Sequence, residues 1–116
     1  MTAGQAFADQ VVARLLPLGP VRARRMFGGW GIFLDDVMFA LIASERLYLK
    51  VDGQTEARFA AVGAEPFVYH RERKRIAMSY REAPAGALDE SEALLPWARL
   101  GLEAARRARV KRRRKR

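Results

Sequence analysis

The chain has 116 residues, the size of one domain, and with half of them hydrophobic and 30% charged it is not a globally disordered polymer. It has no cysteine, which excludes a disulfide framework, a thiolate metal site and a cysteine nucleophile, and no apolar run near the roughly 18 residues of a membrane span. Its net charge of +9 belongs to the last eleven residues, because residues 1–105 hold 13 basic and 13 acidic side chains.

A first helix is predicted over residues 3–16. Its apolar side chains recur at spacings of four, four and three residues, which is typical of one helix face: Phe7, Val11, Leu15 and Leu18. The Pro-Leu-Gly-Pro run at residues 17–20 ends the helix, because proline cannot continue the backbone hydrogen bonds and glycine suits the position after a helix end.

Three strands are predicted next, at residues 30–34, 37–42 and 47–51, from the alternation of their side chains. Short turns at residues 35–36 and 44–45 join them into hairpins. Both faces of the second strand are apolar, so we expect it to lie centrally in the sheet and to be covered on both sides.

A short helix is predicted up to Val62, capped by Asp52 or Thr55, and a second hairpin with strands at residues 67–70 and 76–80 follows. The last helix begins near Asp89, and Pro96 predicts a kink or a short preliminary turn before it. The fold class is therefore α+β: a five-stranded, largely antiparallel sheet flanked by helices, in the order helix, three strands, helix, two strands, helix. We expect five side chains to be buried on this sheet: Phe39, Leu41, Leu49, Phe67 and Met78.

Two blocks, Arg-Met-Phe-Gly-Gly-Trp-Gly-Ile-Phe at residues 25–33 and Met-Phe-Ala-Leu-Ile-Ala at residues 38–43, resemble the N-terminal domain of the TfoX/Sxy competence-regulator family. Further similar pieces occur in the family's order at residues 47–52, 65–69, 78–80 and 95–99. The resemblance implies a five-stranded antiparallel sheet and a non-enzymatic role. Full-length members act as coregulators of DNA-uptake genes with the cyclic-AMP receptor protein, and carry a second, helical domain where this chain has a basic segment. We accordingly divide the chain into a TfoX N-terminal-like domain, residues 1–105, and a basic C-terminal tail, residues 106–116.

The glycine-rich motif is the first candidate site, for a ligand or a partner, because glycine leaves backbone amides accessible. It comprises Phe27, Gly28, Gly29, Trp30 and Gly31. No Gly-Lys-Ser/Thr follows it, and it precedes a strand rather than a helix, so it is neither a P-loop nor a dinucleotide-binding motif. The alternative is a bulge or tight strand entry that lets another element pack closely.

Two basic clusters are candidates for nucleic-acid binding. The hairpin cluster comprises Arg71, Arg73, Lys74 and Arg75. It lies between two tyrosines that could stack on bases. The alternative is a solvated turn whose charges limit aggregation at a sheet edge. A weaker cluster of the same kind is Arg22, Arg24 and Arg25.

The tail is the strongest charge feature, and we interpret it as an electrostatic arm for DNA or RNA without sequence specificity. Its cations are Arg106, Arg107, Arg109, Lys111, Arg112, Arg113, Arg114, Lys115 and Arg116. Its first residues can extend the last helix, and the alternative is a solubilising tail without a dedicated partner. We expect a chain ending at Ala105 to keep its fold.

No nucleophile with an activating base can be assembled, and His70 is the only histidine, so we expect no catalytic residue, no metal and no cofactor. The sequence predicts a cytoplasmic regulatory or adaptor module that contacts an unidentified protein partner and, through its tail, nucleic acid, but no membrane. A small-ligand or peptide-binding module using the glycine-rich strand, or an RNA-associated protein, is the alternative. The oligomeric state is left open.

Overall fold

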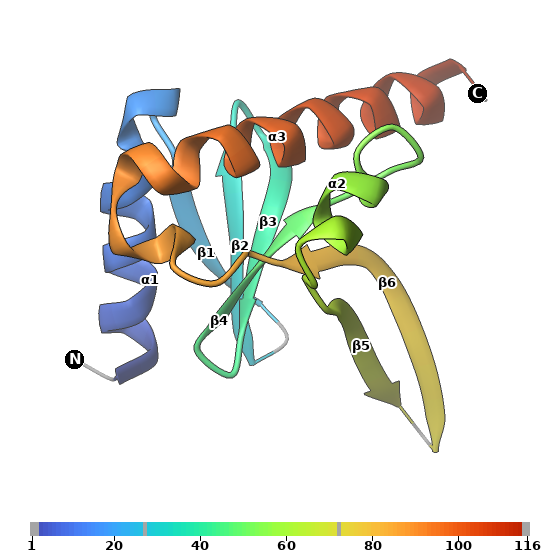
Figure 1. Ribbon diagram of the computed structural model, residues 1–116, viewed down its shortest axis with the longest axis horizontal. Coiled ribbons are helices and arrows are strands. Elements are labelled where there is room, and N and C mark those ends of the chain that lie inside the picture. Colours follow the sequence, from blue (N-terminus) through green and yellow to red (C-terminus); the bar gives the residue numbers. More distant parts are fainter. Residues whose placement is uncertain (1–2, 27, 72, 115–116) are drawn as a thin grey trace.

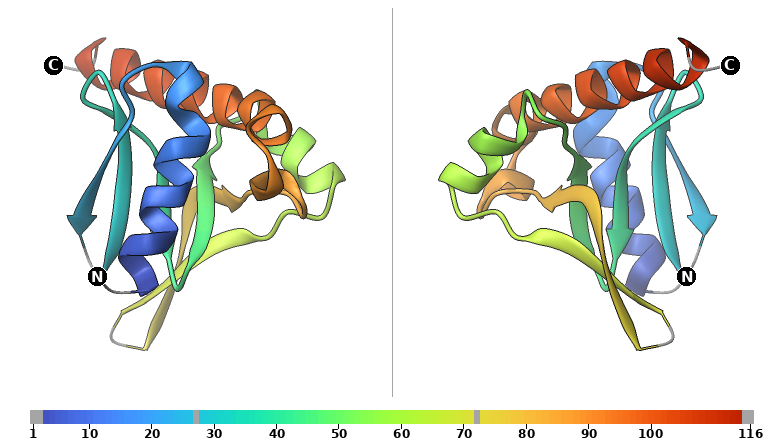
Figure 2. Two further views of the ribbon diagram at one scale, coloured as in Figure 1. Left: turned by 90° about the vertical axis from the view of Figure 1, so that its left-hand side faces the viewer. Right: turned by 90° about the vertical axis from the view of Figure 1, so that its right-hand side faces the viewer.

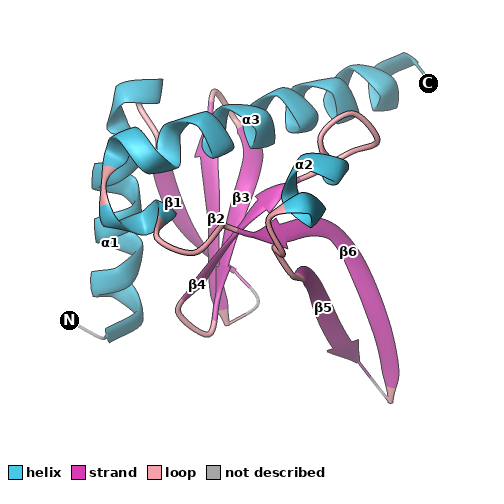
Figure 3. Cartoon of the chain, in the orientation of Figure 1, coloured by secondary structure: helices cyan, strands magenta, loops and turns pink. Residues whose placement is uncertain are grey.

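The computed structural model describes residues 3–26, 28–71 and 73–114, without the side chains of residues 3, 70, 71 and 74–77. Runs of four and two strands lie between the helices, as expected for an α+β domain (Figures 1 and 3). In chain order the elements are α1 (Ala3–Leu15), η1 (Leu16–Leu18), β1 (Arg22–Met26), β2 (Gly29–Leu34), β3 (Val37–Ala43), β4 (Arg46–Lys50), α2 (Glu56–Ala61), β5 (Pro66–Arg71), β6 (Lys74–Glu82), η2 (Ala87–Asp89) and α3 (Ser91–Arg114).

The sheet has six strands in the order β1-β2-β3-β4-β6-β5, and every neighbouring pair is antiparallel. The prediction of five strands is therefore wrong by one, because β1 precedes the three strands read from the sequence. Its Arg-Ala-Arg-Arg-Met sequence has no apolar alternation. An edge strand pairs on one side only, and arginines suit its exposed positions.

One face of the sheet carries the core. Helix α1 packs against β1, β2 and α3, and α3 packs against β3 and β4 (Figures 1 and 2). The largest fully buried side chains come from the helices and from this face of the strands: Phe39, Phe59, Leu15, Ile32, Leu47, Leu49, Leu94 and Val11. Helix α3 approaches the strands closely at Gly101, where a Cβ would lie 3.1 Å from the carbonyl oxygen of Phe39.

The opposite face, which we call the open face, is defined by a row of cross-strand partners. Residues paired directly across antiparallel strands project to the same side of a sheet. The row runs over five strands and consists of Arg24, Gly31, Leu41, Tyr48 and Glu82. Its large apolar members, Leu41 and Tyr48, are only half-buried.

The open face corrects the predicted core. Phe39 and Leu49 are fully buried, as predicted. Leu41 and Phe67 are half-buried and Met78 is 41% exposed, so for these three the prediction is wrong. The ring of Phe67 lies 4.8 Å from that of Tyr48, which places it on the open face. The expectation that the β3 segment is covered on both sides is wrong for the same reason.

Candidate functional site

Helix α3 carries the predicted tail. It runs without a break from Ser91 to Arg114, and its last turns project past the strands (Figure 1). Ala104 and Ala105 are buried against the body, whereas the four residues of the last turn are basic and exposed: Lys111, Arg112, Arg113 and Arg114. Cations favour this end of a helix because its unpaired carbonyl groups carry partial negative charge. Lys115 and Arg116 lie outside the described residues.

Arg107 fastens α3 to the loop after β4. Its Nε donates to Oδ2 of Asp52 at 2.6 Å, and its Nη2 donates to Oδ1 at 3.0 Å. Asp52 Oδ1 also accepts from the backbone N–H of Gln54, at 3.0 Å. The hydrogen bonds from Arg107 are the main reason that the pKa of Asp52 lies below its usual value, and burial of the carboxylate opposes them.

Two further tail cations also contact the body. Arg106 lies 3.8 Å from a carboxylate oxygen of Asp35, and Nη1 of Arg109 donates to the backbone oxygen of the same residue at 3.4 Å. Asp35 and Asp36 form the β2–β3 turn, with φ values of 52° and 62°, as the type I′ hairpin turn requires. The predicted turn is thus confirmed, and it also contacts the helix. The first half of the predicted tail is bound to the folded body, and its second half projects from it.

The largest of three hollows that the described residues form lies over the strands. It has a volume of about 450 Å³, and all the described residues that line it belong to strands: Met26, Gly29, Trp30, Met38, Leu41, Ile42, Ala43, Phe67, Tyr69, Met78 and Tyr80. A second hollow of about 330 Å³ shares Met38 and Tyr80 with it. There the sheet meets the end of α3, through Arg109 and Arg112.

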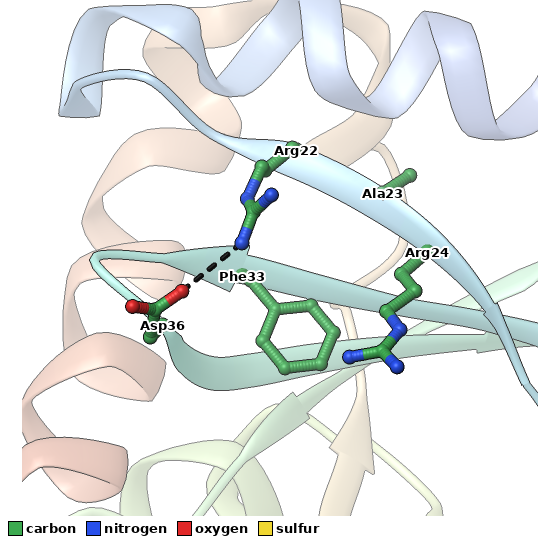
Figure 4. Close-up of a pocket in the computed structure, with 5 residues that line it drawn as sticks. All are labelled: Arg22, Ala23, Arg24, Phe33 and Asp36. Carbon is green, nitrogen blue, oxygen red and sulfur yellow. Dashed lines mark hydrogen bonds and ion pairs between the residues drawn. The ribbon is translucent and has the colours of Figure 1, made fainter.

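A third hollow, of about 250 Å³, borders the second at Phe33 and Asp36 (Figure 4). In Figure 4 the ring of Phe33 lies beside the guanidinium groups of Arg22 and Arg24, which β1 supplies. Arg22 forms an ion pair with Asp36 at 3.0 Å. Arg24 is exposed and has no ion-pair partner among the side chains that the structure describes.

The glycine-rich motif has a structural role at two of its positions. At Gly29 a Cβ would collide with the backbone oxygen of Ile42, so β3 can approach β2 only because no side chain is present. At Gly31 a Cβ would lie 2.5 Å from the sulfur of Met26 and 2.9 Å from the ring of Phe33, and these side chains instead close over the glycine. Both contacts support the alternative of close packing.

The other members of the motif are placed differently. Gly28 has φ of 76° and occupies the connection into β2. Trp30 lines the largest hollow, and the guanidinium carbon of Arg25 lies 5.5 Å from the centre of its ring. Phe27 lies outside the described residues.

The basic hairpin is only partly placed. Strands β5 and β6 extend away from α1 and α3 (Figure 1), and Arg73 lies exposed at the turn with φ of 69°. The side chains of Arg71, Lys74 and Arg75, and that of His70, lie outside the description. The structure therefore does not bring this cluster together with the tail.

The sequence did not predict a functional role for Phe33, Met38 and Lys50, which line these hollows. The signal that could have found Phe33 is its position two residues after Gly31, because residues two apart in a strand share a face. Among the described residues no group of three or more His, Cys, Asp or Glu side chains could hold a metal ion. None of the described helices is long and apolar enough to cross a membrane.

Comparison with known proteins decides the family. The TfoX N-terminal domain matches residues 13–105, which span β1 to β6 and most of α3. The chain belongs to the TfoX N-terminal domain family. It is 38% identical over 63 residues to DNA transformation protein TfoX1 of Aliivibrio fischeri, a match that covers 54% of this chain and 30% of that protein.

It is also 32% identical over 63 residues to DNA transformation protein TfoX of Haemophilus influenzae, covering 53% of this chain and 29% of that protein. The matched part thus spans about a third of the length of either relative. The family resemblance seen in the sequence is confirmed.

Proposed function

We propose that this TfoX-type domain is a non-enzymatic regulatory module for genes of DNA transformation, and that it contacts a protein partner while the basic end of α3 binds duplex DNA without sequence specificity. The two relatives are named as DNA transformation proteins, which supports the biological setting. The observation that carries the DNA contact is the exposed last turn of α3, with four consecutive cations and no ion-pair partner for them among the described side chains.

The contacts of the tail with the body show which of its cations remain available for DNA. Arg106, Arg107 and Arg109 already contact the body, so the attraction to DNA comes from the cations that follow Val110. Each phosphate neutralised on duplex DNA releases counterions and contributes about −0.9 to the slope of log K against log salt. If about five of the six cations after Val110 engage, we expect a slope of roughly −4 to −5.

The test is a chain that ends at Val110, compared with the full chain on one fluorescent DNA duplex over a range of salt concentrations. The shorter chain keeps Arg107 and its bonds to Asp52, so its fold is preserved and only the projecting charge is removed. We expect it to lose nearly all duplex binding. A second variant of the full chain carries glutamines in place of Lys111, Arg112, Arg113 and Arg114, which removes four of the six charges after Val110 and keeps the length. Duplex binding that survives in both variants would overturn the proposal.

A further inference from the structure

The open face is one continuous hollowed surface. Phe33 borders the hollow beside β1 and the hollow beside α3, and Met38 and Tyr80 border both the latter and the largest hollow. The cross-strand pairs Arg22–Phe33 and Phe33–Met38 run from β1 to β3, and the pair Lys50–Tyr80 joins β4 to β6. Met38, Lys50 and Tyr80 line the same hollow. The surface therefore extends over β1, β2, β3, β4 and β6, and the end of α3 borders it at the second hollow.

The middle of this surface consists of rings and thioethers. Phe33 and Phe67 are half-buried, Tyr69 is 40% exposed and Met78 is 41% exposed. Soluble proteins rarely expose such a contiguous apolar patch unless it binds something. Gly31 contributes to this apolar surface because it has no side chain, and the ring of Phe33 lies over the position that a Cβ would occupy.

The border of this surface carries uncompensated positive charge. Arg24 has no ion-pair partner, and neither has Arg112, among the described side chains. Lys50 lies 5.2 Å from the ring centre of Tyr80 and lines the same hollow as Arg112. Burial lowers the pKa of Lys50, the nearby charge of Arg112 lowers it further, and the charge of Asp52 opposes both effects. Lys50 and Arg112 line one hollow, so the two cations repel one another there. An anionic ligand would relieve that repulsion.

The acidic side chains at the border are already engaged. Asp36 is paired with Arg22, and Glu82 lies 3.5 Å from Arg46. The net charge that a ligand meets on this face is therefore positive, at Arg24 on one side and at Lys50 and Arg112 on the other.

We propose that the open face binds single-stranded nucleic acid, with bases on Phe33 and the apolar hollow and phosphates at Arg24, Lys50 and Arg112. Stacking on aromatic side chains combined with a cationic border is the general chemistry of single-strand recognition. Strands lie about 4.8 Å apart, so β2 and β6 are separated by roughly 14 Å, which is enough for two or three bases on a sheet surface.

A duplex does not fit this chemistry, because its base faces are stacked and inaccessible. An acidic peptide would meet the same cations, but it has no planar bases for the ring of Phe33. A substitution of Phe33 therefore distinguishes binding of single-stranded nucleic acid from binding of an acidic peptide. The site shares Arg112 with the projecting turn of α3, but its base contacts lie on the sheet at Phe33, so it goes beyond the duplex contact proposed above.

The test measures binding of fluorescein-labelled (dT)16 to the full chain by fluorescence anisotropy at low salt. We expect Phe33→Leu, which keeps an apolar side chain of similar size, to weaken binding roughly 5- to 100-fold, and Phe33→Tyr, which keeps a ring, to retain it. Arg24→Gln should weaken binding and reduce the salt slope by about 0.7. Arg58→Gln, an equal charge change on exposed α2, is the matched control and should leave binding unchanged.

Two results would overturn the inference. The first is equal (dT)16 affinity for Phe33→Leu and Arg58→Gln, with circular dichroism melting curves showing both variants folded. The second is a full chain that binds an acidic, leucine-containing peptide but not (dT)16. Failure of the duplex proposal is separate: a full chain that binds (dT)16 in a Phe33-dependent manner but does not bind duplex refutes only the duplex contact of the α3 end.

Discussion

Replacing Arg107 by glutamine removes the guanidinium that joins α3 to Asp52 and keeps a long polar side chain in its place. Hydrogen bonds to charged groups contribute about 1.5–3 kcal/mol in proteins, whereas exposed ion pairs contribute about 0.2–1 kcal/mol. The Arg107 side chain is 33% exposed and that of Asp52 is 26% exposed, so this pair lies between the two cases. We expect Arg107→Gln to lower the free energy of unfolding by about 1–2 kcal/mol, which corresponds to a decrease in Tm of roughly 5–10 °C.

The pH dependence follows from the lowered pKa of Asp52. Because the folded-state pKa lies below the unfolded-state value of about 4, the pair stabilises fully above that value. The stabilisation is lost as pH falls through the folded-state pKa. The difference in unfolding free energy between the wild-type chain and Arg107→Gln should therefore be constant near pH 6–7 and should shrink below about pH 4.

Urea denaturation followed by circular dichroism, at several pH values between 3 and 7, measures this difference. The matched control is Arg106→Gln, whose partner Asp35 is 3.8 Å away and 71% exposed. It should cost less than about 0.5 kcal/mol. Equal effects of the two substitutions, or a difference between wild type and Arg107→Gln that does not change with pH, would refute the assignment of Arg107 to the folded body.

Three further predictions concern packing. Phe39→Ala should cost about 3–5 kcal/mol in unfolding free energy because the ring is fully buried, whereas Met78→Ala, on the open face, should cost less than about 1 kcal/mol. Gly29→Ala should destabilise by about 1–3 kcal/mol because its Cβ would collide with the β3 backbone. Gly53→Ala, where nothing lies within 4 Å, is its control and should be near neutral in the same denaturation assay.

Periodicity predicted most elements correctly and failed at β1 for a physical reason. Apolar side chains every two or four residues identify strands and helices that bury one face, and β2, β3, β4 and α1 do so. Strand β1 buries almost nothing, and its pairing with β2 is made by backbone groups that no side-chain pattern reports.

The open face could not be distinguished from the core by sequence. Leu41 and Leu49 are identical residues on adjacent strands, yet one is half-buried and the other is fully buried. Alternation shows that the two sides of a strand differ, but which side receives the helices is decided by where α1 and α3 pack. Where both sides of a strand are apolar, as in β3, alternation does not show which side faces the helices. The apolar side that the helices leave exposed is then available to a ligand.

The charge count of the sequence likewise does not show which ion pairs form, and this matters for the charge on the open face. Residues 1–105 have balanced charge only if Asp35 and Asp52 are counted against cations of that segment. In the fold these two aspartates are paired instead with Arg106 and Arg107, across the boundary that charge counting suggested. Among the described side chains, these two aspartates therefore form no ion pair with body cations such as Arg24 and Lys50. The tail, through its contacts with the body, leaves positive charge uncompensated on the sheet, which is why a surface that sequence arithmetic describes as neutral can attract a polyanion.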